Sequence, residues 1–92
     1  MEIIESVAAL RKHVAPWRET KQRLGFVPTM GNFHQGHLKL VERSCSLTAR
    51  TVVSIFVNPM QFADGEDYKT YPRTFTQDCD YLVAMGVDIL FF

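Results

Sequence analysis

The chain has 92 residues, of which 47% are hydrophobic, so it can bury one modest core and we expect a single domain. Ten Lys and Arg residues balance ten Asp and Glu residues, and the formal net charge at pH 7 is zero. This balance argues against a nucleic-acid-binding surface and against an acidic solvating tail. The longest stretches without charged residues contain Pro, Asn or His, so no membrane-spanning helix is predicted.

The start of the chain and its cysteines indicate a reducing compartment. Residues 1–5 include acidic side chains where a secretory signal would have basic ones, so we expect a cytoplasmic protein. Cys45 and Cys79 fall in the apolar stripes of predicted helices and not in a metal-type or redox-type pair. We therefore expect two reduced thiols in the core and no metal site.

The first predicted element is an amphipathic helix that Ser6 can cap. Its apolar residues recur at helical spacing. They are Val7, Leu10, Val14 and Trp17. Pro16 is expected to break or kink the end of this helix. The apolar residues 25–28 then lack alternation, which predicts a short strand buried on both faces.

A polar loop and a second helix are predicted to follow that strand. Residues 29–36 are polar and contain two glycines, a composition typical of a loop. A helix should begin at or just before His37 and run to about Thr48, because apolar residues repeat there at spacings of three and four. These residues are Leu38, Val41 and Cys45.

The remaining residues predict a strand, a surface loop, a helix and a strand. Residues 51–57 are rich in β-branched side chains and end before Asn58-Pro59. Residues 62–71 are charged and have no apolar period, so they predict a surface loop. Thr74-Phe75-Thr76-Gln77 fits a capping box that opens a helix, and Gly86 should end it. Residues 87–92 are expected to form a third core strand.

Strands that alternate with helices predict an α/β fold, a Rossmann-like parallel sheet with flanking helices and right-handed crossovers. Such sheets bind ligands at the carboxyl ends of their strands. Two predicted loops, residues 28–37 and residues 58–62, leave from such ends. The final strand has no polar tail, so we expect residues 1–92 to be the truncated amino-terminal portion of a longer domain.

His34 and His37 lie three residues apart at the predicted start of the second helix. The positive end of a helix dipole suits phosphate oxygens, and imidazoles there could neutralise a leaving pyrophosphate. Gly31 and Gly36 would let a nucleotide approach the backbone. Histidines at this spacing also occur by chance as caps or solvated side chains, so the spacing alone leaves both interpretations open. No third ligand stands nearby in sequence, which argues against a metal site.

Three sequence blocks resemble those of a known family. The first is Pro28-Thr29-Met30-Gly31-Asn32-Phe33-His34-Gln35-Gly36-His37. It is similar to the signature of the pantothenate synthetase family, in which the His-x-Gly-His motif of the nucleotidylyltransferase superfamily corresponds to His34-Gln35-Gly36-His37. The others are Phe56-Val57-Asn58-Pro59-Met60-Gln61-Phe62, and Glu66-Asp67 followed by Tyr71-Pro72-Arg73-Thr74. The blocks occur in the family's order, and the resemblance covers the whole chain.

The resemblance implies a homodimeric, ATP-dependent ligase that uses Mg²⁺. Pantoate's carboxylate attacks the α-phosphorus of ATP to give pantoyl adenylate and pyrophosphate, and the amine of β-alanine then displaces AMP. The residues expected to contact ATP are Met30, Gly31, Asn32, Phe33, His34, Gln35, Gly36 and His37. The resemblance further implies that His37 is the catalytic proton donor and that Gln61 binds pantoate next to β-alanine, with Asn58 as a weaker candidate for the same pocket.

Plainer interpretations remain for several of these residues. Asn58 and Gln61 flank Pro59 and could simply form a turn. Tyr71 and Arg73 could close over the substrates or be structural. Asp78 could hold Mg²⁺ through water or be an acid favoured at a helix start, so it is not among the predicted site residues.

Family members are much longer, and their carboxyl-terminal domain, which residues 1–92 do not include, carries Lys, Ser and Arg contacts to phosphate. A chain without that cationic clamp is expected to be inactive or nearly so. Two other functions stay open. An adenylyltransferase for a phosphorylated acceptor would need basic residues in the second loop, which is neutral. A non-catalytic module could bind nucleotide or associate with itself through residues 90–92.

Overall fold

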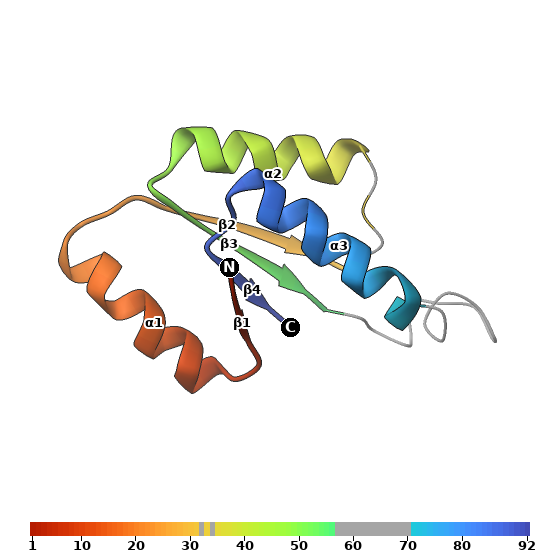
Figure 1. Ribbon diagram of the computed structural model, residues 1–92. Coiled ribbons are helices and arrows are strands. Elements are labelled where there is room, and N and C mark those ends of the chain that lie inside the picture. Colours follow the sequence, from red (N-terminus) through yellow and green to blue (C-terminus); the bar gives the residue numbers. More distant parts are fainter. Residues whose placement is uncertain (32, 34, 57–70) are drawn as a thin grey trace.

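The computed structural model describes residues 1–31, 33, 35–56 and 71–92, with the backbone alone for residues 71–74. Seven elements alternate along these residues: β1 (Glu2–Ile4), α1 (Val7–Glu19), β2 (Leu24–Thr29), α2 (Gln35–Leu47), β3 (Arg50–Ile55), α3 (Tyr71–Met85) and β4 (Ile89–Phe91). The strands form one parallel sheet in the order β1-β4-β3-β2. Helices α2 and α3 cover one face and α1 covers the other (Figure 1). The predicted Rossmann-like α/β fold is therefore confirmed.

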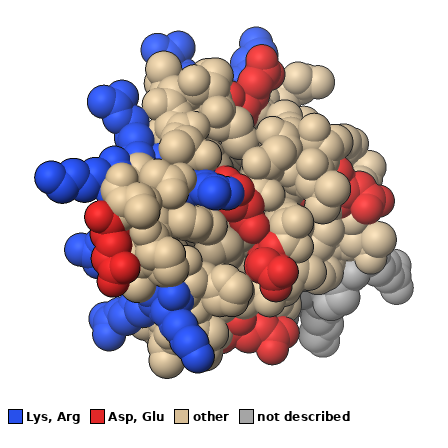
Figure 2. Space-filling view, turned by 60° about the vertical axis from the view of Figure 1, so that its left-hand side comes forward, with Lys and Arg blue, Asp and Glu red and all other residues tan. Residues whose placement is uncertain are grey.

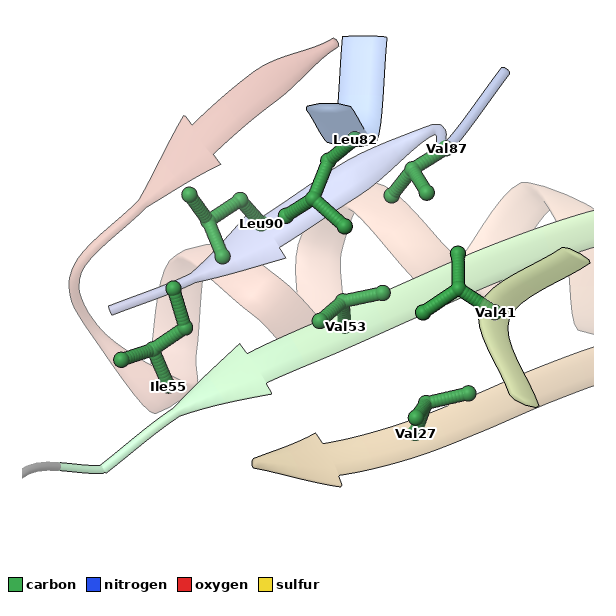
Figure 3. Close-up of a cluster of buried hydrophobic side chains, with 7 residues drawn as sticks. All are labelled: Val27, Val41, Val53, Ile55, Leu82, Val87 and Leu90. Atoms are coloured by element: carbon green, nitrogen blue, oxygen red, sulfur yellow. The ribbon is translucent and has the colours of Figure 1, made fainter. Parts of the chain in front are cut away.

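The core has one apolar cluster on each face of the sheet. The larger cluster lies between the sheet and helices α2 and α3, as Figure 3 shows. Its buried residues are Val27, Val41, Val53, Ile55, Leu82, Val87 and Leu90. The smaller cluster lies under α1 and contains Ile4, Val52 and Ile89. Strand β3 supplies side chains to both clusters, because successive residues of a strand point to opposite faces.

Strand β2 differs from its prediction. Val27 and Thr29 are buried on the face covered by α2, but Phe26 on the other face is 60% exposed. The strand lies at the edge of the sheet formed by the described residues, where Pro28 is tolerated because its missing N–H leaves no central ladder bond unmade. Helix α1 leaves a hollow of about 230 Å³ beside Phe26. The expectation of burial on both faces was wrong.

Helix α1 begins as predicted and ends later than predicted. The Ala9 N–H donates to the Ser6 side-chain oxygen at 3.1 Å, so Ser6 is the N-cap. Pro16 does not break the helix, which continues to Glu19 because a proline removes only one hydrogen bond of the ladder. Val7 is 53% exposed and lies outside the buried stripe. The apolar residues that do pack on the smaller cluster are Ala9, Leu10, Val14 and Trp17.

The later helices confirm most of the expected boundaries. Helix α2 begins at Gln35, just before His37, and Gly86 follows the end of α3 with a left-handed φ of 85°. Helix α3, however, begins at Tyr71 and not at the expected capping box. A proline at the second position is compatible with this start, since its missing N–H would have no partner within the first turn. The predicted surface loop lies outside the described residues apart from Tyr71.

Charged side chains of both signs are mixed on the surface. Lys and Arg gather toward one side of the view in Figure 2, with acidic side chains among and beside them.

The described helices include no candidate for a membrane span, because none combines the necessary length with an apolar composition. Cys45 and Cys79 are free, half-buried thiols that pack against the larger cluster, as expected.

Candidate functional site

The carboxyl ends of β2 and β3 lie side by side. These strands pair in parallel with Thr29 opposite Ile55, and the Phe56 N–H donates to the Thr29 carbonyl at 2.9 Å. In Figure 1 both arrowheads point toward the end of the sheet where α2 and α3 begin. Strands β2 and β3, which precede the two predicted loops in sequence, therefore end at the same edge, as expected for a ligand site in a parallel α/β sheet. Asn58 and Gln61, the predicted pantoate contacts, lie outside the described residues.

The first turn of the loop after β2 is fixed by one hydroxyl group. The Thr29 Oγ1 donates to the Ser54 carbonyl at 2.9 Å and accepts from the Gly31 N–H at 3.2 Å. Gly31 is buried and has φ of 81°, a left-handed conformation that favours glycine. Met30, between them, stays 47% exposed. The turn thus holds its backbone firmly while it presents a side chain at the surface.

Helix α2 starts directly after this loop. Gln35 and Gly36 are exposed, and His37 is half-buried. No acidic residue occupies the first turn of α2, so no carboxylate of that turn opposes an anion at the helix start. The positive end of the helix dipole favours phosphate or carboxylate oxygens at this edge of the sheet.

The ring of His37 lies against the ring of Phe33, with their centroids 5.8 Å apart and their planes at 51°. Phe33 in turn packs on the larger apolar cluster. This aromatic contact restricts the imidazole on one side. Asn32 and His34, two of the predicted ATP contacts, lie outside the described residues, whereas the other six share this edge. Those six are Met30, Gly31, Phe33, Gln35, Gly36 and His37.

Helix α3 adds a buried carboxylate that the sequence had not singled out as a site residue. Asp78 is 2% exposed, and its Oδ1 accepts from the Phe33 N–H at 3.3 Å. Because α3 begins at Tyr71, Asp78 lies in its second turn, and the interpretation as a helix-start acid was wrong. A signal was present, since Asp78 follows Phe75 by three residues and precedes Leu82 by four, which places it on the core-facing stripe.

The residue after Asp78 is Cys79, whose thiol has a raised pKa. Burial raises the pKa of Cys79, and the negative charges of Asp78 and then Asp80 raise it further. Within the described part of the chain, no three His, Cys, Asp or Glu side chains gather as metal ligands would. The candidate site is thus a loop and a helix start with a buried acid behind them.

Known proteins resemble this chain in sequence. The sequence model of the family described as pantoate-beta-alanine ligase matches residues 2–92. A pantothenate synthetase from Nitrosococcus oceani is 53% identical over 91 residues, which is 99% of this chain and 32% of that protein. Another from Chromobacterium violaceum is 55% identical over 92 residues, which is 100% of this chain and 32% of that protein. The chain spans about a third of the length of these relatives.

Solved structures agree with the sequence relatives. A crystal structure of pantothenate synthetase from Thermus thermophilus has a TM-score of 0.77 at 47% identity and covers 99% of this chain and 31% of that one. Pantoate-beta-alanine ligase from Francisella tularensis, crystallised with beta-gamma ATP and beta-alanine, has a TM-score of 0.74 at 40% identity and covers 99% of this chain and 34% of that one. With nearly all of its residues matched in sequence and fold, the chain belongs to the pantoate-beta-alanine ligase family.

Proposed function

We propose that residues 1–92 form the amino-terminal part of an AMP-forming ligase that joins pantoate and β-alanine into pantothenate with the use of ATP. The observation that carries this proposal is the motif loop before α2, held at the carboxyl edge of a parallel sheet in a chain of this family. The Francisella tularensis relative, crystallised with an ATP analogue and β-alanine, supports two of the three substrates.

The first step of the proposed reaction uses the loop and the start of α2. A carboxylate oxygen of pantoate attacks the α-phosphorus of ATP, and the bond to pyrophosphate breaks. Residues 30–37 contact ATP, and the α2 dipole stabilises the negative charge that develops on the phosphates. His37 donates a proton to the leaving pyrophosphate, with its ring held by Phe33. The second step needs an attack by the β-alanine amine on the acyl carbon of the adenylate, with loss of AMP.

Gln61 and Asn58 complete the proposed pocket for pantoate. A side-chain amide can donate and accept hydrogen bonds at the same time, which suits a ligand with both hydroxyl and carboxylate groups. Phe56, the first residue of the sequence block that contains them, donates through its N–H to the Thr29 carbonyl at the end of β2. The block therefore starts next to the ATP loop, where the two substrates must meet.

Mg²⁺ is proposed to bind together with ATP. This ion usually keeps several waters and binds one or two carboxylates together with substrate phosphates. Among the described residues no cluster of three possible metal ligands exists, and the Asp78 carboxylate is buried against Phe33. These residues do not fit a metal cage, so we assign Mg²⁺ to the phosphates of ATP and route no step through a protein-bound ion.

The active site is proposed to be completed by residues that follow Phe92 in the whole enzyme. The match covers 32% of each of the two relatives, so they are about three times as long. We propose that the phosphate clamp implied by the family resemblance lies in the remaining, carboxyl-terminal part. We propose that the 92-residue chain is inactive alone. The homodimer and the cytoplasmic location are proposed for the whole enzyme.

A chimera tests this function. Residues 1–92 replace the matching third of the Chromobacterium violaceum pantothenate synthetase, which is 55% identical to them. We expect pantothenate to form only when pantoate, β-alanine and ATP are all present, and no turnover from residues 1–92 alone. The unmodified relative and its own carboxyl-terminal two thirds serve as positive and negative controls.

Two results would contradict the proposal. One is a chimera that melts like the relative but forms no pantothenate. The other is pyrophosphate release with a phosphorylated acceptor and none with pantoate, which would identify an adenylyltransferase of different specificity.

A further inference from the structure

The buried carboxylate of Asp78 lies behind the loop before α2, on the core-facing stripe of α3. Gln77 and Asp80, its neighbours on the same helix, are exposed, while Asp78 is 2% exposed. Moving a carboxylate out of water is unfavourable unless hydrogen bonds replace its hydration. The Phe33 N–H supplies one such bond to Oδ1 at 3.3 Å, from a residue 45 positions earlier in the chain.

Phe33 extends this contact toward the reacting groups. Its backbone is bonded to Asp78, its ring packs on the larger apolar cluster, and the same ring lies 5.8 Å from the ring of His37. A shift of the Phe33 backbone therefore moves the surface against which His37 rests. Catalytic geometry is sensitive to such shifts, because a misplacement of about 1 Å can lower a rate about 100-fold.

The loop is thus held at two places by two different side chains. Thr29 fixes its first turn to the end of β3 through the Ser54 carbonyl and the Gly31 N–H. Asp78 fixes its middle to α3. The first contact joins the ends of two neighbouring strands. The second joins the loop to helix α3, through an acceptor 45 residues later in the chain.

We propose that Asp78 is a positioning residue for ATP: its carboxylate holds the Phe33 backbone, and Phe33 holds the imidazole of His37. The proposal rests on the function proposed above, because it assigns the loop to ATP. In this role Asp78 acts through Phe33. Its loss therefore affects the use of ATP and leaves the affinity for β-alanine unchanged.

Substitutions at this position separate the hydrogen bond from the charge. Asn keeps an oxygen that can accept from the Phe33 N–H, whereas Ala has no acceptor. A hydrogen bond to a charged acceptor is about twice as strong as one to a neutral acceptor. The expected order of activity is therefore wild type, Asp78→Asn and Asp78→Ala.

The test measures pantoate-dependent exchange between ATP and pyrophosphate in the chimera. We expect Asp78→Ala to lower kcat/KM for ATP about 10- to 100-fold, mainly through kcat, because a misplaced imidazole acts on the transition state. Asp78→Asn should recover most of this loss, and KM for β-alanine in the complete reaction should not change. Asp80→Ala is the matched control, since it removes an exposed carboxylate from the same helix and should leave every constant unchanged.

Three results would overturn the inference. They are an Asp78→Ala variant with the wild-type kcat and KM for ATP, an Asp78→Asn variant as defective as Asp78→Ala, and an equal effect of Asp80→Ala. Amide hydrogen exchange of the unmutated chimera covers the case in which Asp78→Ala does not fold. Slow exchange of the Phe33 N–H is expected, and exchange at the rate of an exposed amide would contradict the contact. An inactive wild-type chimera with a protected Phe33 would refute the proposed function and leave the contact standing.

Discussion

Polar side chains have different hydrogen-bonding partners at the two ends of the parallel sheet. At the amino end they bind one another and the backbone of the neighbouring strands and turns: Arg50 forms an ion pair with Asp88 at 3.2 Å and donates to the Gln22 side chain at 3.0 Å. Its guanidinium also lies 5.0 Å from the centre of the Trp17 ring. This network ties α1, β3 and the turn before β4 together.

At the carboxyl end the polar side chains hold backbone groups of a loop. Thr29 binds the Gly31 N–H, and Asp78 binds the Phe33 N–H. The loop keeps Met30, Gln35 and Gly36 exposed while its backbone is restrained. The amino end thus closes on itself and stabilises the fold, whereas the carboxyl end keeps side chains at the surface, where we propose the ATP site. Substitutions at the amino end should change stability alone, and those at the carboxyl end should change activity.

The largest expected effect is at the carboxyl end. In the chimera, His37→Ala should lower the rate of ATP–pyrophosphate exchange at least about 100- to 1,000-fold, the typical loss when one donor to a developing negative charge is removed. The melting temperature should stay close to the wild-type value. His13→Ala, at an exposed position on α1, is the matched control. Exchange at the wild-type rate in His37→Ala would rule out its catalytic role.

The second-largest expected effect is a loss of stability when a side chain is added at Gly25, where β2 packs closely on α2. A methyl group added at Gly25 would collide with the Ser44 hydroxyl and lie 3.1 Å from the Thr48 Oγ1. Overpacking of this kind costs about 1–3 kcal/mol, so Gly25→Ala should lower the free energy of urea unfolding of the chimera by that amount. The double substitution Gly25→Ala with Ser44→Ala should regain part of the loss. Equal stability of Gly25→Ala and wild type would show that α2 does not pack this closely on β2.

The ionic network at the amino end should give a smaller effect. The Asp88 Oδ2 accepts from the N–H of buried Thr51 at 2.8 Å, and an orphaned buried N–H costs about 1–2 kcal/mol. Asp88→Ala should lower the unfolding free energy of the chimera by this amount without a change in kcat. Asp88→Asn should lose less, because it keeps an acceptor and the ion pair is partly exposed. A large fall in kcat in a stable Asp88→Ala variant would break the distinction between the two ends.

The smallest expected effect is a shift in the pKa of Cys79 when the charge of Asp78 is removed. Burial and the charges of Asp78 and Asp80 raise the pKa of Cys79, so its thiolate forms at higher pH than in a free thiol. In a Cys45→Ser background, the pH profile of alkylation of Cys79 should therefore move to lower pH in Asp78→Asn, and less far in Asp80→Asn. The profile is read from the alkylation rate measured by mass spectrometry. An unchanged profile in Asp78→Asn would mean that the charge of Asp78 does not reach Cys79.

Local signals were sufficient for most elements. Ser6 and the apolar spacing behind it predicted α1, the β-branched run predicted β3, and Gly86 marked the end of α3. Strand β1 was missed, because three residues are too short to show a period of two. The start of α3 was misplaced because Thr74 to Gln77 is a valid capping box by sequence, but α3 had already begun at Tyr71.

The sequence by itself predicted the order of every element after β1, because these elements depend on neighbours in the chain. The motif loop and its candidate residues from Met30 to His37 came from the family resemblance. Only the tertiary structure decided that β2 lies at the edge of the sheet that the described residues form, with Phe26 exposed, and that Asp78 lies behind Phe33. The reason is sequence distance. Ser54 is 25 residues from Thr29, and Asp78 is 45 residues from Phe33, so their contacts exist only once the strands have paired and α3 has packed on the sheet.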